Sequence, residues 1–196
     1  MLDQTDKKWI EQAKKSPEAF VFLYQKYHHK IFNYFWYRLN HHDALSDDLT
    51  QETFLKAFES IGRFQDRGYS YQTYLFTIAH NVLSNFFRSK KFSDLENVER
   101  IPDSFLEHLQ SRLELQEIWR AVKRLPRQQK NAFLLRYRED HSVREIAQIM
   151  RQSENSVKLL LSRARTRLRR QNLRGIALLP SGAAGRSHPH FLGSRH

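Results

Sequence analysis

The sequence predicts an all-α fold made of two small helical domains joined by a flexible linker. Residues 1–174 contain few helix breakers, because only two glycines and three prolines occur among them. Apolar residues recur at spacings of three or four, as they do on one face of a helix. The alternation of polar and apolar residues that marks a half-buried strand is absent from the sequence.

The first long helix is predicted over residues 17–39, after a short helix near residues 5–15. Ser16 is a typical N-cap, and Pro17 is favoured at the first helical position. The apolar positions of the long helix are three or four residues apart and include Phe20, Leu23, Tyr24, Tyr27, Ile31, Tyr34 and Phe35.

Two more helices complete the first domain, which we place over residues 5–91. The second helix is predicted over residues 43–61, and Gly62 ends it. Its apolar positions are Leu45, Leu49, Phe54, Leu55 and Phe58. Ser70 can cap the third helix, which is predicted to reach about residue 91.

A linker and a second domain follow. Residues 92–103 are acidic, contain a proline and lack helical periodicity, so we interpret them as the linker. The second domain is predicted over residues 104–171, and it opens on a serine and a glutamate spaced as in a capping box. Its first helix ends before Pro126, and the next is predicted over residues 127–138. Residues 172–196 show no pattern and are expected to be disordered.

The last two helices of this domain have the pattern of a helix-turn-helix. Ser142 and Glu145 form a second capping box before a short helix, and Ser153 caps the next helix after a turn of three or four residues. A short capped helix, a tight turn and a basic second helix are typical of proteins that read the major groove. One stripe of the second helix is apolar and consists of Val157, Leu161, Ala164 and Leu168. Its outward positions are Glu154, Asn155, Lys158, Leu159, Ser162, Arg163, Arg165 and Arg169. The alternative is an ordinary helical hairpin with a solvated basic face.

Positive charge is concentrated in two segments of the chain. The net charge is +12, from 33 Lys and Arg against 21 Asp and Glu. Residues 61–91 carry five basic and one acidic side chain, and residues 121–170 carry 14 basic and four acidic ones. Residues 1–60 are nearly neutral, and residues 92–120 are acidic. Clustered positive charge is typical of a surface that binds nucleic acid, so the two segments predict two DNA-facing surfaces.

The composition excludes several other functions. Without cysteine the chain has no disulfide, no thiolate nucleophile and no Cys-ligated metal. The histidines lack the spacing of zinc ligands, and Asp47 and Asp48 are helix neighbours that cannot face each other as an acid–base pair. We therefore expect no catalytic residue, no metal and no cofactor. The longest apolar stretch, residues 31–37, is far below the roughly 20 residues that cross a bilayer, and no signal peptide is visible, so we expect a soluble cytoplasmic protein.

Several segments, taken in order, resemble the sigma-70 family of bacterial RNA polymerase. Residues 47–58 (DDLTQETFLKAF) resemble region 2.2, and residues 71–82 (YQTYLFTIAHNV) resemble regions 2.3–2.4. Residues 133–169, together with the Leu-Pro pair before them, resemble region 4, and the SRAR at 162–165 is especially telling. The order, the spacing and the short linker resemble the extracytoplasmic-function (ECF) sigma factors, and the resemblance covers roughly residues 5–170.

The resemblance implies that the protein binds core RNA polymerase, selects promoters and melts the −10 element without catalysing a reaction. Its implied partners are promoter DNA and the β′ clamp and β flap of the polymerase. ECF factors are commonly held by an anti-sigma factor, although no residue identifies one here. The implied contacts to the clamp come from Asp48, Gln51, Glu52 and Phe54. Helical periodicity places Lys56 on the same exposed face, while Leu49 and Phe58 pack inward; a solvated acidic face is the alternative.

The third helix carries side chains of the kinds that hold unpaired bases. Melting a duplex needs aromatic surface and side chains that read a base edge. The aromatic and polar candidates are Tyr69, Tyr71, Tyr74, Phe86, Phe87, Arg63, Arg67, His80, Asn81, Arg88, Lys90 and Lys91. For most of the rings a place in the core is the stronger alternative.

The resemblance narrows these candidates. It implies −10 contacts from Tyr74, Asn81, Arg88, Lys90 and Lys91. It places Asn81 where the family reads a flipped non-template base, and residues 65–70 at the specificity loop. The family usually has tryptophan where this chain has Tyr74.

By the same resemblance, the second helix of the helix-turn-helix docks in the −35 major groove. The residues placed nearest DNA are Lys158, Leu159, Ser162, Arg163 and Arg165. Many family members have serine or arginine where this chain has Leu159 and Leu160. Leu159 therefore either contacts a thymine methyl group or marks an altered −35 preference.

The residues leave two other functions open. One is a helix-turn-helix transcriptional regulator whose N-terminal helices form an interaction domain. The other is a sigma-like adaptor that binds polymerase without directing initiation. The motif at residues 47–58, joined to an aromatic and basic third helix, favours the sigma factor because a repressor needs neither.

Overall fold

The computed structural model describes residues 3–66, 68–89 and 119–170, and these are helices, turns and loops without a strand among them. The chain divides into two compact units, Met1–Ile101 with Ala147–Gln152 and Pro102–Ile146 with Ser153–His196. The predicted all-α class is confirmed for the described residues. The linker, the first capping box and the C-terminal tail lie outside them.

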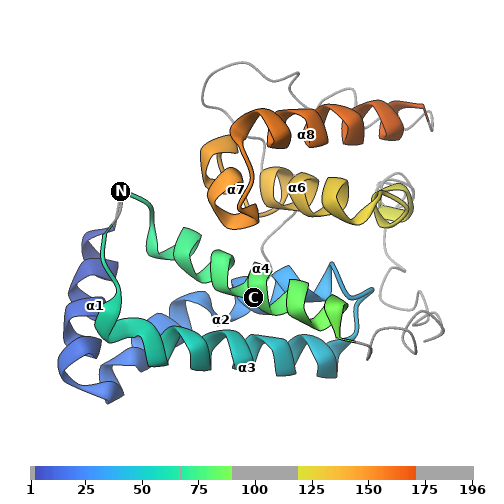
Figure 1. Cartoon of the computed structure of the whole chain (residues 1–196). Helices are drawn as coiled ribbons and strands as arrows, with labels where there is room; N and C mark the ends of the chain where they lie inside the picture. The colour runs from blue at the N-terminus through green and yellow to red at the C-terminus, as the bar shows by residue number, and fades with distance from the viewer. Residues whose placement is uncertain (1–2, 67, 90–118, 171–196) are drawn as a thin grey trace, which may run out of the picture. The chain divides into compact units, whose positions relative to one another are not determined.

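In the described part of residues 1–101, helices α1 to α4 pack together (Figure 1). α1 (Gln4–Lys15) packs on α2 (Phe20–Trp36), and α2 packs against both α3 (Asp43–Ser60) and α4 (Tyr71–Arg88). Because α3 and α4 also pack against each other, the three long helices enclose one core. Its largest fully buried side chains come mainly from α2 and α4, with Ile10 from α1, and include Leu23, Ile31, Tyr34, Phe35, Tyr71, Leu75, Phe76 and Leu83.

The first long helix is shorter at both ends than its periodicity predicted. Residues Pro17–Ala19 form a separate 3₁₀ turn, η1, before α2 begins. After α2, the backbone turns through left-handed conformations at Asn40 (φ 55°) and His41 (φ 67°). Leu39 is buried within this turn, so its apolar side chain extended the helical pattern past the helix itself.

α3 and α4 begin where the sequence predicted. Ser70 caps α4, because its Oγ accepts a hydrogen bond of 3.1 Å from the backbone N–H of Thr73. α4 ends earlier than predicted, because Ser89 adopts extended backbone angles while its N–H still donates to the carbonyl of Asn85.

A buried carboxylate fastens α1 to α2. Asp6 is 1% exposed and accepts hydrogen bonds from the Tyr27 hydroxyl (2.6 Å) and the Lys26 ammonium (2.7 Å). Burial, with Asp6 beside it, raises the pKa of Tyr27. Burial alone would lower the pKa of Lys26, but its hydrogen bonds to Asp3 and Asp6 raise it. The buried Asp6 side chain thus has a hydrogen-bond donor from the phenol of Tyr27 and another from the ammonium of Lys26, as a buried polar group requires.

The C-terminal helices are α6 (Arg127–Tyr137), α7 (Val143–Met150) and α8 (Glu154–Arg169), and α6 packs against α8. The helix predicted before Pro126 is described only at its end, where residues 119–123 are helical. Pro126 then stands at the N-cap of α6, where its missing N–H removes no helical hydrogen bond.

Both predicted caps of the helix-turn-helix are confirmed. The N–H of Ser142 donates to the Glu145 carboxylate at 2.9 Å, and the N–H of Glu145 donates back to the Ser142 hydroxyl at 3.2 Å. Ser153 caps α8 by accepting from the N–H of Ser156 at 3.1 Å. In the turn between α7 and α8, Arg151 takes the left-handed conformation (φ 52°). The Ser142–Glu145 bonds thus mark where α7 starts, and the Ser153 cap marks where α8 starts.

Candidate functional site

α8 separates a buried stripe from an exposed basic face. The predicted stripe is confirmed, since Val157, Leu161, Ala164 and Leu168 are all buried. Of the predicted DNA-facing residues, Lys158, Leu159, Ser162 and Arg163 are exposed, and Arg165 is partly buried at the edge of the face. The helix therefore offers cations and a hydroxyl on one side, the groups that contact phosphates and base edges.

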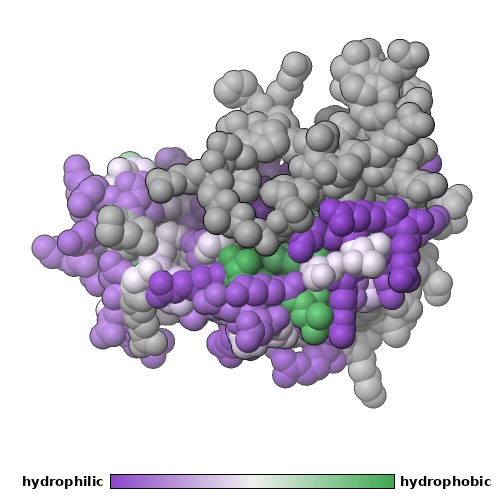
Figure 2. Space-filling view, turned by 90° about the horizontal axis from the view of Figure 1, so that it is seen from above, coloured by the Kyte–Doolittle hydropathy of each residue, from purple (hydrophilic) through white to green (hydrophobic). Residues whose placement is uncertain are grey.

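Leu159 is an exposed apolar side chain within that face. It is 48% exposed, whereas its neighbour Leu160 is partly buried. On the face shown in Figure 2, hydrophilic side chains cover most of the described surface, and a hydrophobic area is visible near its centre. Packing against the described residues therefore does not explain why position 159 is a leucine.

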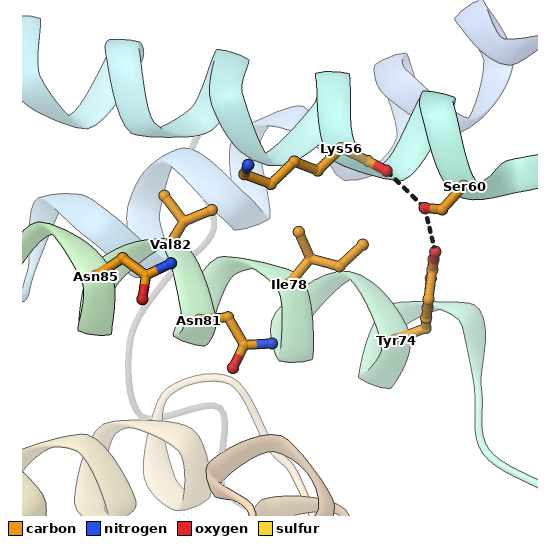
Figure 3. A pocket seen from close by; sticks show the side chains of 7 residues that line it. All are labelled: Lys56, Ser60, Tyr74, Ile78, Asn81, Val82 and Asn85. Carbon is orange, nitrogen blue, oxygen red and sulfur yellow. Dashed lines mark hydrogen bonds between the residues drawn. The ribbon is translucent and has the colours of Figure 1, made fainter.

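An open hollow of about 250 Å³ lies between α3 and α4 (Figure 3). α3 contributes Lys56 and Ser60 to its lining, and α4 contributes Tyr74, Ile78, Asn81, Val82 and Asn85. The mixture of two amides, one ammonium and aliphatic side chains suits a flat, partly polar group such as a base. Asn81 was predicted to read a flipped base, and it is one of the residues that line this hollow.

Tyr74 is fixed in place beside this hollow. Its hydroxyl lies 2.6 Å from the Oγ of Ser60. Its ring packs against those of Phe64 (centroids 4.9 Å apart) and Tyr71 (5.6 Å). Although the side chain is only partly buried, contacts on several sides limit its rotation.

Two of the candidates on the third helix are core residues. Tyr71 is fully buried, and burial raises the pKa of its hydroxyl. His80 is 8% exposed, and its Nδ1 lies 3.1 Å from the Tyr34 hydroxyl. Neither side chain is placed to touch DNA, because both face the packed interior between α2 and α4.

Arg88 is exposed in the last turn of α4, where its guanidinium donates to the Asn85 side chain at 3.2 Å. It therefore lies next to one of the amides of the hollow. Tyr69 is partly buried, and so are Phe86 and Phe87, whose rings contact each other. Lys90 and Lys91 lie outside the described residues.

The predicted polymerase-facing residues divide between surface and core. Asp48, Gln51 and Glu52 are exposed on α3. Phe54 is not: it is 4% exposed, and its ring packs against Tyr24 (centroids 4.8 Å apart). The prediction of a direct contact from Phe54 is therefore wrong for this conformation, because the side chain fills the space between α2 and α3.

The converse error concerns Phe58. Phe58 was expected to pack inward, but it is 38% exposed and touches Phe20 edge-on. Lys56 is exposed as predicted and forms an ion pair with Glu52 at 3.4 Å, and it also lines the hollow on the α4 side. Leu49 is buried as predicted.

Sequence reasoning missed the apolar surface beside this acidic face. Leu55 (57% exposed) follows Gln51 by one helical turn, and Phe58 follows Leu55. On α2, Val21 and Tyr24 are also exposed. The signal lay in α3 itself, whose apolar residues spread over more than one face at about 100° per residue, so they cannot all be buried.

None of the described helices is long and apolar enough to cross a membrane. Within the same part of the chain, no group of three or more His, Cys, Asp or Glu is placed to hold a metal ion.

Comparisons with known proteins give consistent matches. The family model for sigma-70 region 2 matches residues 23–93, and the model for sigma-70 region 4 matches residues 115–168. The ECF RNA polymerase sigma factor BldN of Streptomyces coelicolor is 37% identical over 166 residues, which cover 79% of this chain and 61% of BldN. The ECF RNA polymerase sigma factor SigW of Bacillus subtilis is 30% identical over 186 residues, covering 87% of this chain and 98% of SigW.

A solved structure shares the fold. It contains the sigma factor RpoE from Bartonella quintana in complex with the anti-sigma factor NepR. It matches 78% of this chain and 96% of that chain with a TM-score of 0.61, at 23% sequence identity.

Proposed function

Because this chain belongs to the sigma-70 family and to its ECF group, we propose that it binds core RNA polymerase and directs promoter-specific initiation of transcription. Members of this family are initiation factors rather than catalysts, and we propose that this chain has no catalytic residue of its own. We place its action in the cytoplasm, where polymerase and promoter DNA are found.

The observation that carries the proposal is that α3 contributes to two different surfaces. Its exposed Asp48, Gln51 and Glu52 lie beside the exposed Leu55. One turn further, Lys56 and Ser60 line the hollow shared with α4. A DNA-binding regulator needs neither a polymerase-docking face nor a hollow for unpaired bases. On this chain, α3 contributes to both.

We assign polymerase binding to the first of these surfaces. Apolar side chains surrounded by polar ones are the usual composition of a protein interface. Here Leu55 and Phe58 supply the apolar part, and the polar part comes from Asp48, Gln51 and Glu52. Phe54 supports the surface from beneath through its packing on α2.

We assign −10 recognition to the hollow and to the basic end of α4. Asn81 reads the edge of an unpaired base, and Arg88, Lys90 and Lys91 neutralise phosphates. The amide of Asn85 and the ammonium of Lys56 also line the hollow. We assign them to contacts with the same strand. Tyr74 forms one side of the hollow rather than a free stacking platform, because its hydroxyl is held by Ser60.

We assign −35 recognition to the exposed face of α8. Lys158, Arg163 and Arg165 supply positive charge, and Ser162 supplies a hydroxyl near the base edges. This assignment is supported by the separation of these residues from the buried stripe of the same helix. We further propose that the chain engages the β′ clamp and β flap of the polymerase and is regulated by an anti-sigma factor.

The test is transcription with purified components. The protein is added to sigma-free core polymerase, and transcripts are mapped on genomic DNA fragments. We expect discrete start sites that need both components. Tight duplex binding by the protein alone, with no initiation at any salt concentration, would instead identify a DNA-binding regulator.

A further inference from the structure

The loop between α3 and α4 is joined to the other helices of its unit at both of its ends. It begins after η2 (Ile61–Arg63), which packs against α1, and it ends at Tyr71, the first residue of α4. Gln65, Asp66 and Gly68 are exposed, and the left-handed Gly68 (φ 80°) donates its N–H to the Asp66 carboxylate. That bond shapes the loop itself, whereas the contacts at the two ends join the loop to the helices.

α2 supports the end of the loop through Tyr27. The centroid of this buried ring lies 5.8 Å from that of Tyr71, and Phe64, at the start of the loop, meets Tyr71 edge-on at 5.4 Å. Three residues further along α2, the Lys30 ammonium donates to the side chain of Gln72 at 2.8 Å. The first turn of α4 therefore rests on α2, and the Phe64 ring rests on the same tyrosine.

Asp6 of α1 fixes the orientation of Tyr27. Its carboxylate accepts hydrogen bonds from the phenol at 2.6 Å and from the Lys26 ammonium at 2.7 Å. The same ammonium lies 5.3 Å from the centroid of the Tyr27 ring. Because a hydrogen bond to a carboxylate is strong and directional, it holds the phenol at one end while the Tyr71 ring packs against its side.

α1 thus contributes to both ends of the loop. It packs against η2 before the loop, and its Asp6 orients the tyrosine that touches α4 after the loop. A packed interior contains little free volume, so a shift of one buried ring is passed on to its neighbours. A change at Asp6 is therefore expected to reach the loop through Tyr27 and Tyr71.

We infer that Asp6 is a positioning residue for −10 recognition, because it orients Tyr27 and thereby sets the place of the loop that leads into α4. This inference rests on the proposed function, which assigns −10 recognition to α4. Asp6 itself is 1% exposed and reads no base. It acts on the −10 element only through the two tyrosines and the loop that they support.

Amide hydrogen exchange on the free, full-length protein tests the structural half of this inference without polymerase or DNA. Tyr27→Phe keeps the ring and removes the bond to Asp6. We expect faster exchange at the backbone amides of Phe64 and Thr73, which lie at the two ends of the loop, as well as within α1. Faster exchange confined to α1 would overturn the inference.

Thr50→Val is the matched control for the loss of one buried hydrogen bond. The Thr50 hydroxyl is buried on α3 and donates to the Ser46 carbonyl at 2.6 Å. Its removal costs a bond of the same kind, but the bond lies within α3. We expect this variant to leave exchange at the two ends of the loop unchanged. Faster exchange there in Thr50→Val as well would contradict a special role for Asp6.

Oligonucleotide binding by holoenzyme tests the functional half. Two single strands are compared, one with the non-template −10 sequence of a promoter on which the protein initiates and one with the same bases permuted. We expect wild-type holoenzyme to prefer the first. In Tyr27→Phe the ratio of the two affinities falls about two- to thirtyfold, the range in which mutations along a packed network change the coupling of two sites. Affinities for core polymerase and for a −35 duplex stay at the wild-type level.

Substitutions of Asp6 itself give a graded result. Asp6→Asn keeps an acceptor for the phenol and is expected to lose less of the sequence preference than Asp6→Leu does. An unchanged preference in Tyr27→Phe, or an equal loss of core and −35 binding, would overturn the inference, because the bond would then serve stability alone. A wild-type holoenzyme that binds both strands equally would count against the proposed function instead, and the exchange experiment would still decide whether Asp6 positions the loop.

Discussion

Glu52 and Lys56 form an ion pair of 3.4 Å along α3, yet the two side chains belong to different surfaces. Glu52 lies on the face assigned to polymerase, and Lys56 lines the hollow assigned to the −10 strand. Both are about half exposed, so the pair itself contributes at most about 1 kcal/mol to stability. Their roles are therefore separable by mutation.

We predict opposite binding defects for the two single variants. Glu52→Ala weakens binding to core polymerase and leaves −10 strand binding by the assembled holoenzyme unchanged. Lys56→Ala weakens −10 strand binding and leaves core affinity unchanged, because its ammonium faces the hollow. Fluorescence anisotropy with labelled core or labelled oligonucleotide measures each effect. Lys14→Ala, which breaks the exposed Glu11–Lys14 pair on α1, is the matched control. Loss of both activities in each variant would show that the two surfaces are not independent.

We predict that Phe54 and Leu55, although adjacent in sequence, differ in what they support. Phe54→Ala lowers the free energy of unfolding by about 3–5 kcal/mol, because it leaves a cavity between α2 and α3. Leu55→Ala changes stability by less than about 0.5 kcal/mol, since the side chain is 57% exposed, but it weakens binding to core polymerase. Urea denaturation and core titration measure the two quantities. Full stability of Phe54→Ala would contradict the buried placement of that ring.

We predict that Leu159 reads a thymine methyl group in the −35 element. Replacing thymine by uracil throughout a −35 duplex removes only methyl groups, and each buried methyl contributes about 0.8 kcal/mol, or three- to fourfold in affinity. The wild-type holoenzyme is expected to lose about this factor. Leu159→Ala is expected to bind both duplexes equally. A thymine preference of undiminished size in Leu159→Ala would assign the effect to another side chain.

We predict that stability falls at alkaline pH because of Tyr27 and Tyr71. Burial raises the pKa of both hydroxyls above their usual value of 10.0, so the unfolded chain loses these protons first. Their contribution is fully present below about pH 10 and is lost above it, by about 1.4 kcal/mol per pH unit for each tyrosine. Urea denaturation between about pH 9 and pH 11 measures the slope.

Replacing each tyrosine by phenylalanine separates the contributions of Tyr27 and Tyr71 to this pH dependence. The buried Tyr71 hydroxyl has no hydrogen-bond partner among the described residues, so Tyr71→Phe is expected to flatten the alkaline slope without loss at neutral pH. Tyr27→Phe also flattens the slope, but it costs about 1–3 kcal/mol at neutral pH because Asp6 loses a donor. An unchanged slope in both variants would contradict this account.

Local signals predicted much of this fold. Ser70, Ser142 and Ser153 each make the cap that their spacing predicted, because a cap depends on atoms only two or three residues apart. The buried stripe of α8 was also predicted in full, since its four residues recur three or four positions apart on one side of the helix.

The candidate site was predicted less completely, and α3 shows why. Its apolar residues surround the helix, and periodicity does not say which of them meet a neighbour. Phe54 is buried because Tyr24 of α2 lies beside it, and Phe58 stays exposed because α2 covers only part of it. The Ser60–Tyr74 bond joins two helices across a loop, so no pattern within either helix predicted it.

The most direct test of the central claim is to map unpaired thymines with permanganate on a promoter that supports initiation. We predict reactive thymines around the −10 element when core polymerase and this protein are both present, and none when either is omitted. With Asn81→Ala, the reactivity should fall while core binding is retained. A duplex that stays unreactive with both components, although the protein alone binds it tightly, would contradict the assignment as a sigma factor.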